Sequence, residues 1–301
     1  IDFDFNSNKF KKYDHVIACY SGVEPPIGKL SNIIIFTTAW PKFNNNAENI
    51  RVNAFNKKYN VNLKPTRNIK ETKISNLEMY RDIYLVGNKW TRSTYPVELQ
   101  KKIKILPSQP SFYSKDLVRE NVLKQKESNK FIFFGSSCGL IHKGLDLVLG
   151  ALEEFGDIDL DIQVMGKIDN EKEVVSTLRE QLKHKSIRLI GWVDIGSKKF
   201  MNIFKKASFC LLPTCSEGQS ESVITCMANG IIPITTKMSG VDLDEKCIEI
   251  SNNISSVKNG ILKGISLQKE ELYIMRKNCI EYVDQLRIIS QEAENDIIRN
   301  M

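Results

Sequence analysis

The sequence has 301 residues, 42% of them hydrophobic and 26% charged, which is enough for two α/β domains and excludes a disordered or fibrous protein. Residues 1–126 carry 22 Lys and Arg against 11 Asp and Glu, whereas the rest carry 21 against 25, so the net charge of +7 comes from the first part. The longest apolar runs, such as residues 32–40, are too short to cross a bilayer.

The first part of the chain predicts four short strands, at residues 15–21, 32–39, 82–88 and 102–108. Helical patterns cover residues 47–59 and, over a shorter stretch, 91–99. Four strands are few for a doubly wound domain, and the sequence starts without Met. We therefore expect an incomplete first domain whose sheet lacks strands preceding Ile1.

From Lys130 onward the alternation of strand and helix patterns is regular. Strands are predicted at residues 131–137, 160–166, 187–193, 208–214, 231–236 and 247–251. Helices are predicted at residues 143–155, 171–184 and 197–207, after Gln219, and at 268–286 and 290–301. Short apolar strands that alternate with helices indicate βαβ units and a parallel sheet covered on both faces.

The polar stretch 107–130, with two prolines, is typical of a linker between two domains. We expect a first domain at 1–126, a second at 127–285, and a terminal helix at 286–301 that packs back on the first domain. The predicted fold class is α/β, with two doubly wound domains that face a ligand-binding cleft.

In a parallel α/β sheet, ligands lie beyond the carboxyl ends of the strands. In the first such loop, residues 135–147, Lys143 stands at the start of a predicted helix, where a bound anion would offset the positive helix end. The loop matches neither of the common glycine-rich nucleotide motifs. His142 is more typical of a packing or surface residue than of a base.

The second loop, CSEGQSESVITCMANGIIPI from Cys215 to Ile234, leads from a strand into a helix that begins near Gln219. Unpaired N–H groups at that helix start, next to Gly218, form an anion site suited to a diphosphate. Glu217 lies just outside and is a candidate acceptor for sugar hydroxyls.

The third loop, residues 190–200, offers backbone groups to a base. Ser197 is predicted as the N-cap of the helix that follows, and Trp192 is more typical of a core residue than of a stacking platform.

These elements, in this order and spacing, resemble the nucleotide-binding domain of retaining GT-B glycosyltransferases, in particular family 4, over residues 130–250. The resemblance implies two Rossmann-like domains. It also implies that Lys143 binds the donor diphosphate and that Glu217 contacts the donor sugar, which makes these two the catalytic candidates. The donor-binding residues that it implies are Ser137, Cys138, Gly139, Gly166, Gly191, Trp192, Val193, Gly218, Gln219, Ser220, Glu221 and Thr225.

Two positions depart from the family pattern. Thr225 stands where the family usually has a second Glu for the nucleotide ribose, and Cys138 stands where its glycine-rich loop often has an Arg. We therefore expect weaker binding of the nucleotide ribose, and a diphosphate site that depends more on Lys143 for positive charge.

We expect a retaining transferase that moves a sugar from a nucleotide-diphosphate donor to a glycan or polyprenyl-linked acceptor, in bacterial surface polysaccharide assembly. No cofactor or metal is expected, because lysine and backbone donors can neutralise the diphosphate. The seven cysteines form no Cys-x-x-Cys pair and are typical of reduced core residues in a cytoplasmic protein. The basic first half predicts peripheral contact with anionic lipid at the inner face of the cell membrane. The alternative is that its excess charge only increases solubility. No nucleic-acid partner is expected, since interleaved aromatic motifs are lacking.

Two alternatives stay open. A sugar-nucleotide epimerase on the same architecture would need a carboxylate or His from the first domain, for which Glu24 and His15 are the candidates. A non-catalytic nucleotide-sugar binder is compatible with Thr225 and Cys138.

Overall fold

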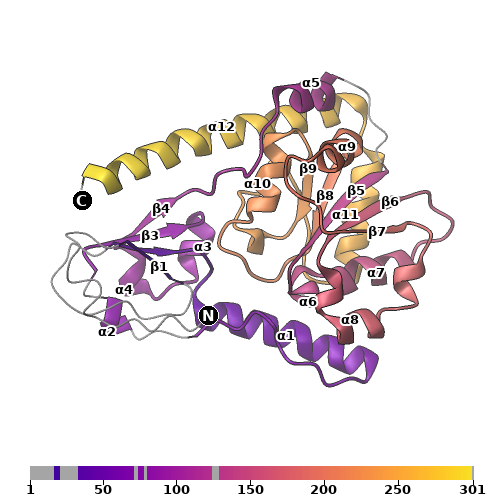
Figure 1. The fold of residues 1–301 in the computed structure, drawn as a ribbon, viewed down its shortest axis with the longest axis horizontal. Coiled ribbons are helices and arrows are strands. Elements are labelled where there is room, and N and C mark those ends of the chain that lie inside the picture. The colour runs from indigo at the N-terminus through magenta and orange to yellow at the C-terminus, as the bar shows by residue number, and fades with distance from the viewer. Residues whose placement is uncertain (1–16, 21–32, 71–73, 78–79, 124–128, 300–301) are drawn as a thin grey trace.

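The computed structural model describes residues 17–20, 33–70, 74–77, 80–123 and 129–299. Within these ranges the chain forms two parallel sheets, each flanked by helices (Figure 1). Glu24 and His15, the epimerase candidates, lie outside the described residues. Among the described helices, none is both long and apolar enough to cross a membrane.

The first sheet contains the four strands expected from the sequence, in the order β1-β2-β3-β4. They are β1 (Ile17–Tyr20), β2 (Ile33–Phe36), β3 (Asp82–Val86) and β4 (Ile103–Leu106). One face packs against the short helices α2 (Ile74–Leu77), α3 (Lys89–Ser93) and α4 (Val97–Gln100). Alternate side chains such as Ile34 and Ile83, paired in register, point into this core.

The second sheet has the six predicted strands, in the order β10-β9-β8-β5-β6-β7. They are β5 (Lys130–Ser136), β6 (Asp161–Gly166), β7 (Ile187–Gly191), β8 (Phe209–Leu212), β9 (Ile232–Thr235) and β10 (Ile248–Glu249). The chain runs outward from β5 to β7, then returns to β8 on the other side of β5. The point where the order reverses therefore lies between β5 and β8, and it is there that doubly wound sheets bind ligands.

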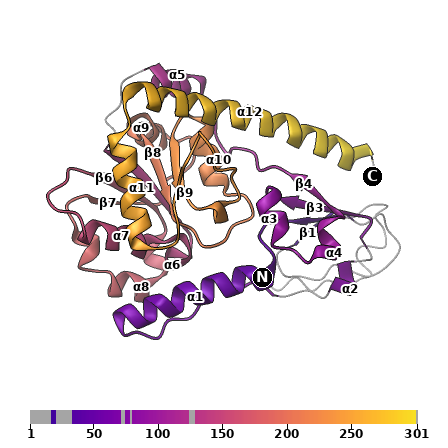
Figure 2. The same ribbon diagram turned by 180° about the vertical axis from the view of Figure 1, so that it is seen from behind.

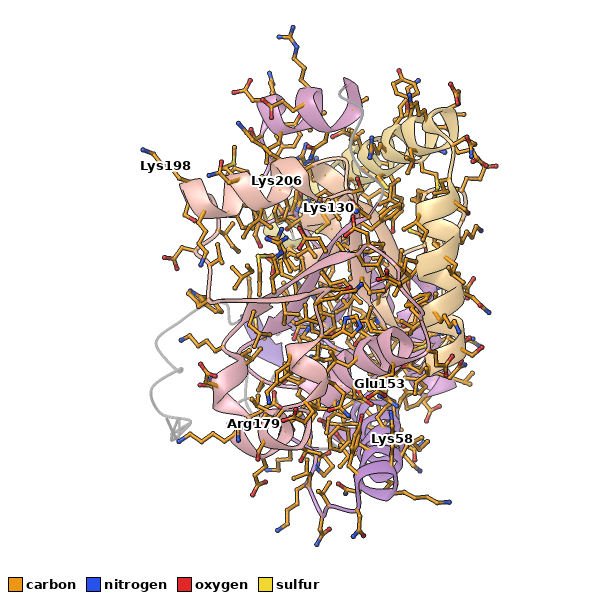
Figure 3. All side chains as sticks on the ribbon, turned by 90° about the vertical axis from the view of Figure 1, so that its right-hand side faces the viewer. Lys58, Lys130, Glu153, Arg179, Lys198 and Lys206 are labelled. Atoms are coloured by element: carbon orange, nitrogen blue, oxygen red, sulfur yellow. The ribbon has the colours of Figure 1, made fainter. Side chains whose placement is uncertain are left out.

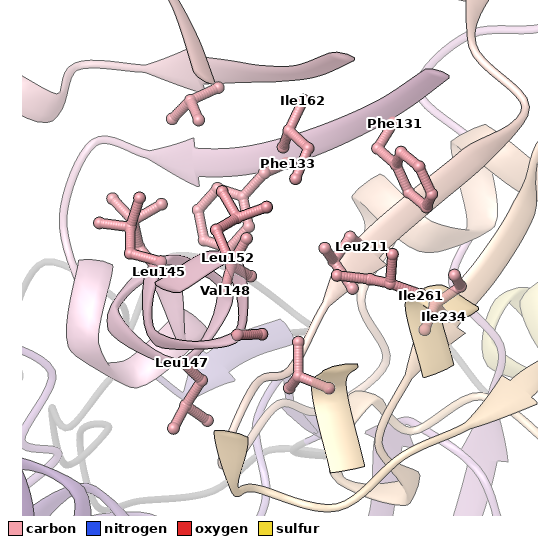
Figure 4. Close-up of a cluster of buried hydrophobic side chains, with 14 of the residues drawn as sticks. Phe131, Phe133, Leu145, Leu147, Val148, Leu152, Ile162, Leu211, Ile234 and Ile261 are labelled. Atoms are coloured by element: carbon pink, nitrogen blue, oxygen red, sulfur yellow. The ribbon is translucent and has the colours of Figure 1, made fainter. Parts of the chain in front are cut away.

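Helices cover both faces of the second sheet. They are α6 (Leu140–Lys143), α7 (Leu145–Glu153), α8 (Lys172–Thr177), α9 (Lys198–Lys206), α10 (Glu221–Ala228) and α11 (Ile254–Ser266), with the 3-10 turns η2 (Ile168–Asn170), η3 (Gln181–Lys183) and η4 (Lys237–Ser239). Phe131 and Phe133 of β5 pack on the α7 face, as Figure 4 shows, whereas Ile132 faces the side of α9 and α10. This alternation buries both faces and explains the continuous apolar strands.

Helix α1 (Pro41–Tyr59) belongs to the first half of the sequence but packs on the second sheet's domain (Figures 1 and 2). Val52 and Phe55 enter the same apolar cluster as α7. Nη2 of Arg51 lies 2.7 Å from both carboxylate oxygens of Asp146, and both side chains are 8% exposed. At the surface nearby, Nζ of Lys58 lies 3.8 Å from Glu153 (Figure 3).

Two expectations about the remaining helices are corrected. The stretch 107–130 is not only a linker, because it contains α5 (Lys115–Leu123), whose Leu117 is fully buried against the second domain. The two helices expected at 268–286 and 290–301 are one continuous helix, α12 (Lys269–Arg299).

The end of α12 returns to the first sheet and packs on the face opposite α2 and α4 (Figure 1). Ile297 packs against Ile33 and Tyr84, and Asp296 accepts a hydrogen bond from the Tyr84 hydroxyl at 2.7 Å. Nζ of Lys104 lies 2.7 Å from the same carboxylate. One helix thus connects the two domains.

Candidate active site

A cavity of about 450 Å³ lies beyond the carboxyl ends of β5 to β8, at the point where the strand order reverses. The predicted site residues that line it are Ser137, Lys143, Gly166, Trp192, Val193, Glu217, Gly218, Gln219, Ser220, Glu221 and Thr225. The first half of the chain contributes Thr37, Arg67 and Ser111. Loops distant in sequence meet here because parallel strands place all their carboxyl ends at one edge.

Glu217, in the loop between β8 and α10, lies at the centre of a charged cluster. Its Oε1 is 3.1 Å from Nζ of Lys143 and 3.4 Å from Nη1 of Arg67, and it accepts a hydrogen bond of 3.2 Å from the Thr214 hydroxyl. The side chains of Glu217 and Lys143 are only 12% and 7% exposed. Among the residues that the structure describes, Oε2 of Glu217 accepts no hydrogen bond.

The two cations hold Glu217 in its ionised form. Burial alone would raise the pKa of this carboxyl, but Lys143 and Arg67 outweigh burial and lower the pKa to about 2. Glu217 reciprocally raises the pKa of Arg67. Glu217 is therefore ionised at neutral pH.

Lys143 does not begin a helix, as the sequence suggested, but ends the short helix α6. Its N–H donates to the Gly139 carbonyl at 2.8 Å, and Gly144 turns the chain into α7 with a φ of +81°. Lys143 thus directly precedes the N-cap of α7, and the carboxylate of Glu217 offsets its positive charge there.

His142 is buried beside the cluster, with 1% of its surface exposed. Its Nε2 contacts the Ser216 carbonyl, which can only accept, so Nε2 carries the hydrogen of the neutral ring. Burial lowers the pKa of His142 to about 4. This environment fits the interpretation of His142 as a packing residue.

Gly218 lies at the junction of the two domains. Its carbonyl accepts a hydrogen bond of 2.6 Å from the hydroxyl of Thr91, a residue of α3 in the first domain. A Cβ atom at position 218 would lie 2.2 Å from the Thr37 carbonyl oxygen, so no side chain fits. Close backbone approach explains why Gly218 stands at the mouth of α10. Ser220, the N-cap of α10, is fixed by an N–H bond of 2.8 Å to the Ser239 carbonyl.

Thr225 lines the cavity, yet its hydroxyl is already engaged. It is 3% exposed, and its Oγ1 accepts a 3.0 Å hydrogen bond from the Ser111 N–H. Glu221 and Asn229, one helical turn before and one after Thr225, also accept hydrogen bonds. Glu221 accepts from the Ser111 hydroxyl, and Asn229 accepts from the Ser114 N–H at 3.1 Å. These side chains, four residues apart on one helix face, bind the segment that joins the two domains.

The third loop differs from the sequence interpretation at one residue. Trp192 is not in the core but 55% exposed at the cavity, with its Nε1 donating to Asp194 at 2.9 Å. Gly191 before it has a φ of +76°. The predicted N-cap is confirmed, since the Ser197 hydroxyl accepts from the Phe200 N–H.

Comparison with known proteins bears on the second half of the chain. Residues 128–262 match the sequence model of the family described as glycosyl transferases group 1. This part of the chain is similar to that family. The resemblance inferred from the sequence motifs is thereby confirmed. No sequence match was found among curated proteins.

Solved structures show that the glycosyltransferase domain belongs to a two-domain GT-B fold. Sucrose-phosphate synthase from Thermosynechococcus elongatus superposes with a TM-score of 0.66 at 12% identity, covering 97% of this chain and 75% of that one. A glycosyltransferase from Rickettsia africae ESF-5 gives 0.58 at 13%, covering 90% of each chain. HepE from Anabaena, in complex with UDP and glucose, gives 0.61 at 10%, covering 97% and 80%.

The described residues contain no group of three or more His, Cys, Asp or Glu side chains arranged for a metal ion. The sequence contains Asp-x-Asp at residues 2–4, 157–161 and 242–244. Residues 2–4 lie outside the described residues, and none of the other carboxylates lines the cavity. All seven cysteines are free thiols, and five of them are buried.

Arg67 is the site residue that the sequence analysis missed. It lies in no recognisable motif, between α1 and α2, and the excess of basic residues in the first half was the only signal for it. Cys138, Gly139 and Gly191, all predicted to bind the donor, are not among the described residues that line the cavity. Gly139 instead lies beneath Arg67.

Proposed function

We propose that this protein is a retaining glycosyltransferase that moves a sugar from a nucleotide-diphosphate donor to a hydroxyl of a glycan or polyprenyl-linked acceptor. One observation carries the proposal: the ionised Glu217, between two cations, borders a cavity at the carboxyl edge of a group 1 glycosyltransferase domain. Two similar structures were solved with UDP and a sugar, HepE and the pneumococcal O-GlcNAc transferase GtfA.

In this proposal Lys143 and the N-terminal N–H groups of α10 bind the donor diphosphate. Charge grows on the diphosphate as the bond from the sugar C1 to the leaving oxygen breaks, and preorganised positive groups stabilise that charge. The acceptor oxygen bonds to C1 on the same face, and the departing diphosphate takes the acceptor proton. Lysine and backbone donors supply the positive charge, so the proposal requires no metal.

Glu217 would position the donor sugar. Its Oε1 is held by Lys143 and Arg67, whereas its Oε2 is the oxygen left to accept from a neutral sugar hydroxyl. A fixed carboxylate orients the ring without approaching the phosphates, which repel it.

Two variants test these roles. We expect Glu217→Gln to retain nucleotide binding and to lower transfer on the order of 10²-fold, because an orienting contact is loosened. We expect Lys143→Ala to weaken both nucleotide-diphosphate binding and turnover, because the charge it meets exists before and during the reaction. Radiolabelled transfer and calorimetry measure both. If Glu217→Gln abolished diphosphate binding while Lys143→Ala left it intact, the roles would be assigned wrongly.

The same assay separates the alternatives. An epimerase would isomerise the donor sugar without an acceptor, and a non-catalytic binder would bind donor without turnover. From the first half, the described cavity lining contains Thr37, Arg67 and Ser111, none of which is a carboxylate or His. Transfer is therefore the outcome expected.

The cellular setting is also a proposal. We expect the enzyme to act in the cytoplasm on surface polysaccharide, with its basic first half on anionic lipid at the inner face of the cell membrane. Each Lys or Arg near such a surface contributes about 1 kcal/mol, screened by salt. Co-sedimentation with anionic and neutral vesicles across salt concentrations tests this, and binding that ignores both would mean the charge serves solubility alone.

A further inference from the structure

Arg67 and Lys143 approach the same oxygen of Glu217 from opposite halves of the chain. One carboxylate balances one of these two charges. The other carboxylate in the described cavity lining, Glu221, is exposed and accepts from the Ser111 hydroxyl. Within the described cavity lining, a bound anion would therefore meet two cations beside the one carboxylate of Glu217. The carboxylate of Glu48 also acts on Arg67, but backbone N–H groups of Thr66 and Arg67 already bind it.

Arg67 has donors left for such an anion. Its guanidinium carries five N–H groups, and the described residues receive one contact from it, the 3.4 Å contact of Nη1 with Glu217. Its side chain is 29% exposed, and it lines the cavity rather than the outer surface. A planar fork of this kind suits phosphate oxygens.

The backbone of Arg67 is held in place by α1. The buried carboxylate of Glu48 accepts hydrogen bonds from the N–H groups of Thr66, at 3.0 Å, and Arg67, at 2.9 and 3.1 Å. The buried amide of Asn44 donates to the Arg67 carbonyl at 3.0 Å. Residues 61–70 alternate between half-buried and exposed, so the segment lies extended along the helix.

Helix α1 is in turn fixed to the glycosyltransferase domain, through the buried pair of Arg51 with Asp146 and through Val52 and Phe55. The Arg67 side chain crosses the loop after β5: a Cβ atom at Gly139 would lie 2.5 Å from Cδ of Arg67. Arg67 therefore keeps its place relative to Lys143 although it comes from the first half of the sequence.

We propose, building on the function above, that Arg67 binds the donor diphosphate together with Lys143, and that α1 with residues 61–67 is an arm that presents it. Arg67 would be a binding residue of the donor site, and Glu48 its positioning residue. The class of ligand is a nucleoside diphosphate, whose two phosphates span two cations.

The experiment is a set of matched binding measurements. A thermal-shift screen of the parent with UDP, GDP and ADP identifies the nucleoside diphosphate that binds. Calorimetry then compares that nucleotide with its free nucleoside for the parent, Arg67→Gln, Arg67→Lys and Lys64→Gln. Lys64 is an exposed cation of the same segment and controls for loss of charge at a distance. Circular dichroism checks that each variant is folded.

We expect Arg67→Gln to weaken nucleoside diphosphate binding about tenfold, as loss of a charged hydrogen bond would do, and to leave nucleoside binding unchanged. Arg67→Lys should restore most of the affinity, and Lys64→Gln should bind like the parent. The loss should persist in a Glu217→Gln background, because Arg67 then still meets the phosphates.

Two results would overturn this inference and leave the proposed function standing. One is an unchanged nucleotide affinity in Arg67→Gln. The other is a loss of affinity that disappears in the Glu217→Gln background, because Arg67 would then be a partner of Glu217 only. If none of the three nucleotides binds the parent, the proposed function fails, and this inference fails with it.

Discussion

The buried His142 should make the stability of this protein depend on pH in a narrow, calculable window. Burial lowers its pKa to about 4 in the folded protein, against an ordinary value of 6.5. Above pH 6.5 the ring is neutral in both the folded and the unfolded chain. As the pH falls toward 4, the unfolded chain binds the proton first, so stability is lost. The shift corresponds to a loss of about 2 kcal/mol between pH 7 and pH 5, using about 1.4 kcal/mol for each pKa unit.

The other buried carboxyls beside the site differ from His142 either in the pH window or in the sign of their effect on stability. Glu217, with a pKa lowered to about 2, loses its contribution only as the pH falls from about 4.5 toward 2. Burial raises the pKa of Glu48 and Glu171, so these carboxyls act in the opposite direction. The difference between the parent and a His142→Gln variant therefore isolates His142, because Gln still donates to the Ser216 carbonyl but does not titrate.

Urea unfolding at several pH values between 4 and 7 measures the effect. We expect the parent to lose about 2 kcal/mol more than His142→Gln between pH 7 and pH 5. His184→Gln, at a partly exposed histidine away from the cavity, serves as the matched control. Parallel pH profiles for the parent and His142→Gln would show that the ring is not buried in its neutral form, and the described geometry of the cluster would be wrong.

Two structural predictions follow from the contacts between the halves. Asp146→Asn should lower the free energy of unfolding by about 3 kcal/mol, because it leaves the buried Arg51 without its charged partner. Glu153→Gln, in the half-exposed pair with Lys58, should lower it by less than about 1 kcal/mol. Equal losses in urea unfolding would mean that burial of the pair of Arg51 and Asp146 does not affect stability. Gly218→Ala should lower the free energy of unfolding by about 1–3 kcal/mol, because its Cβ meets the Thr37 backbone. A thermal unfolding midpoint equal to that of the parent would show that the two domains are not in close contact at this residue.

The sequence by itself determined the strands and the loops that follow them. The ten strands that the structure describes were all predictable, because buried parallel strands are short apolar runs between turn residues, as in β5 and β8. The loops with Lys143 and Glu217 followed, because ligand sites lie after strands in such sheets and the residues are local in sequence. The match of residues 128–262 to group 1 glycosyltransferases confirms the family resemblance, whereas the roles of Lys143 and Glu217 stay predictions.

Only the tertiary structure decided which distant residues share the site. Arg67 reaches Glu217 because α1 docks on the other domain, and that docking depends on a buried ion pair and on apolar contacts that no local pattern encodes. Likewise, α12 is one helix because its end packs on the first sheet, and the hydroxyl of Thr225 is occupied by the Ser111 N–H. Strand patterns are local and periodic, whereas these contacts join residues about 95 to 264 positions apart, so they become visible only once the chain is folded.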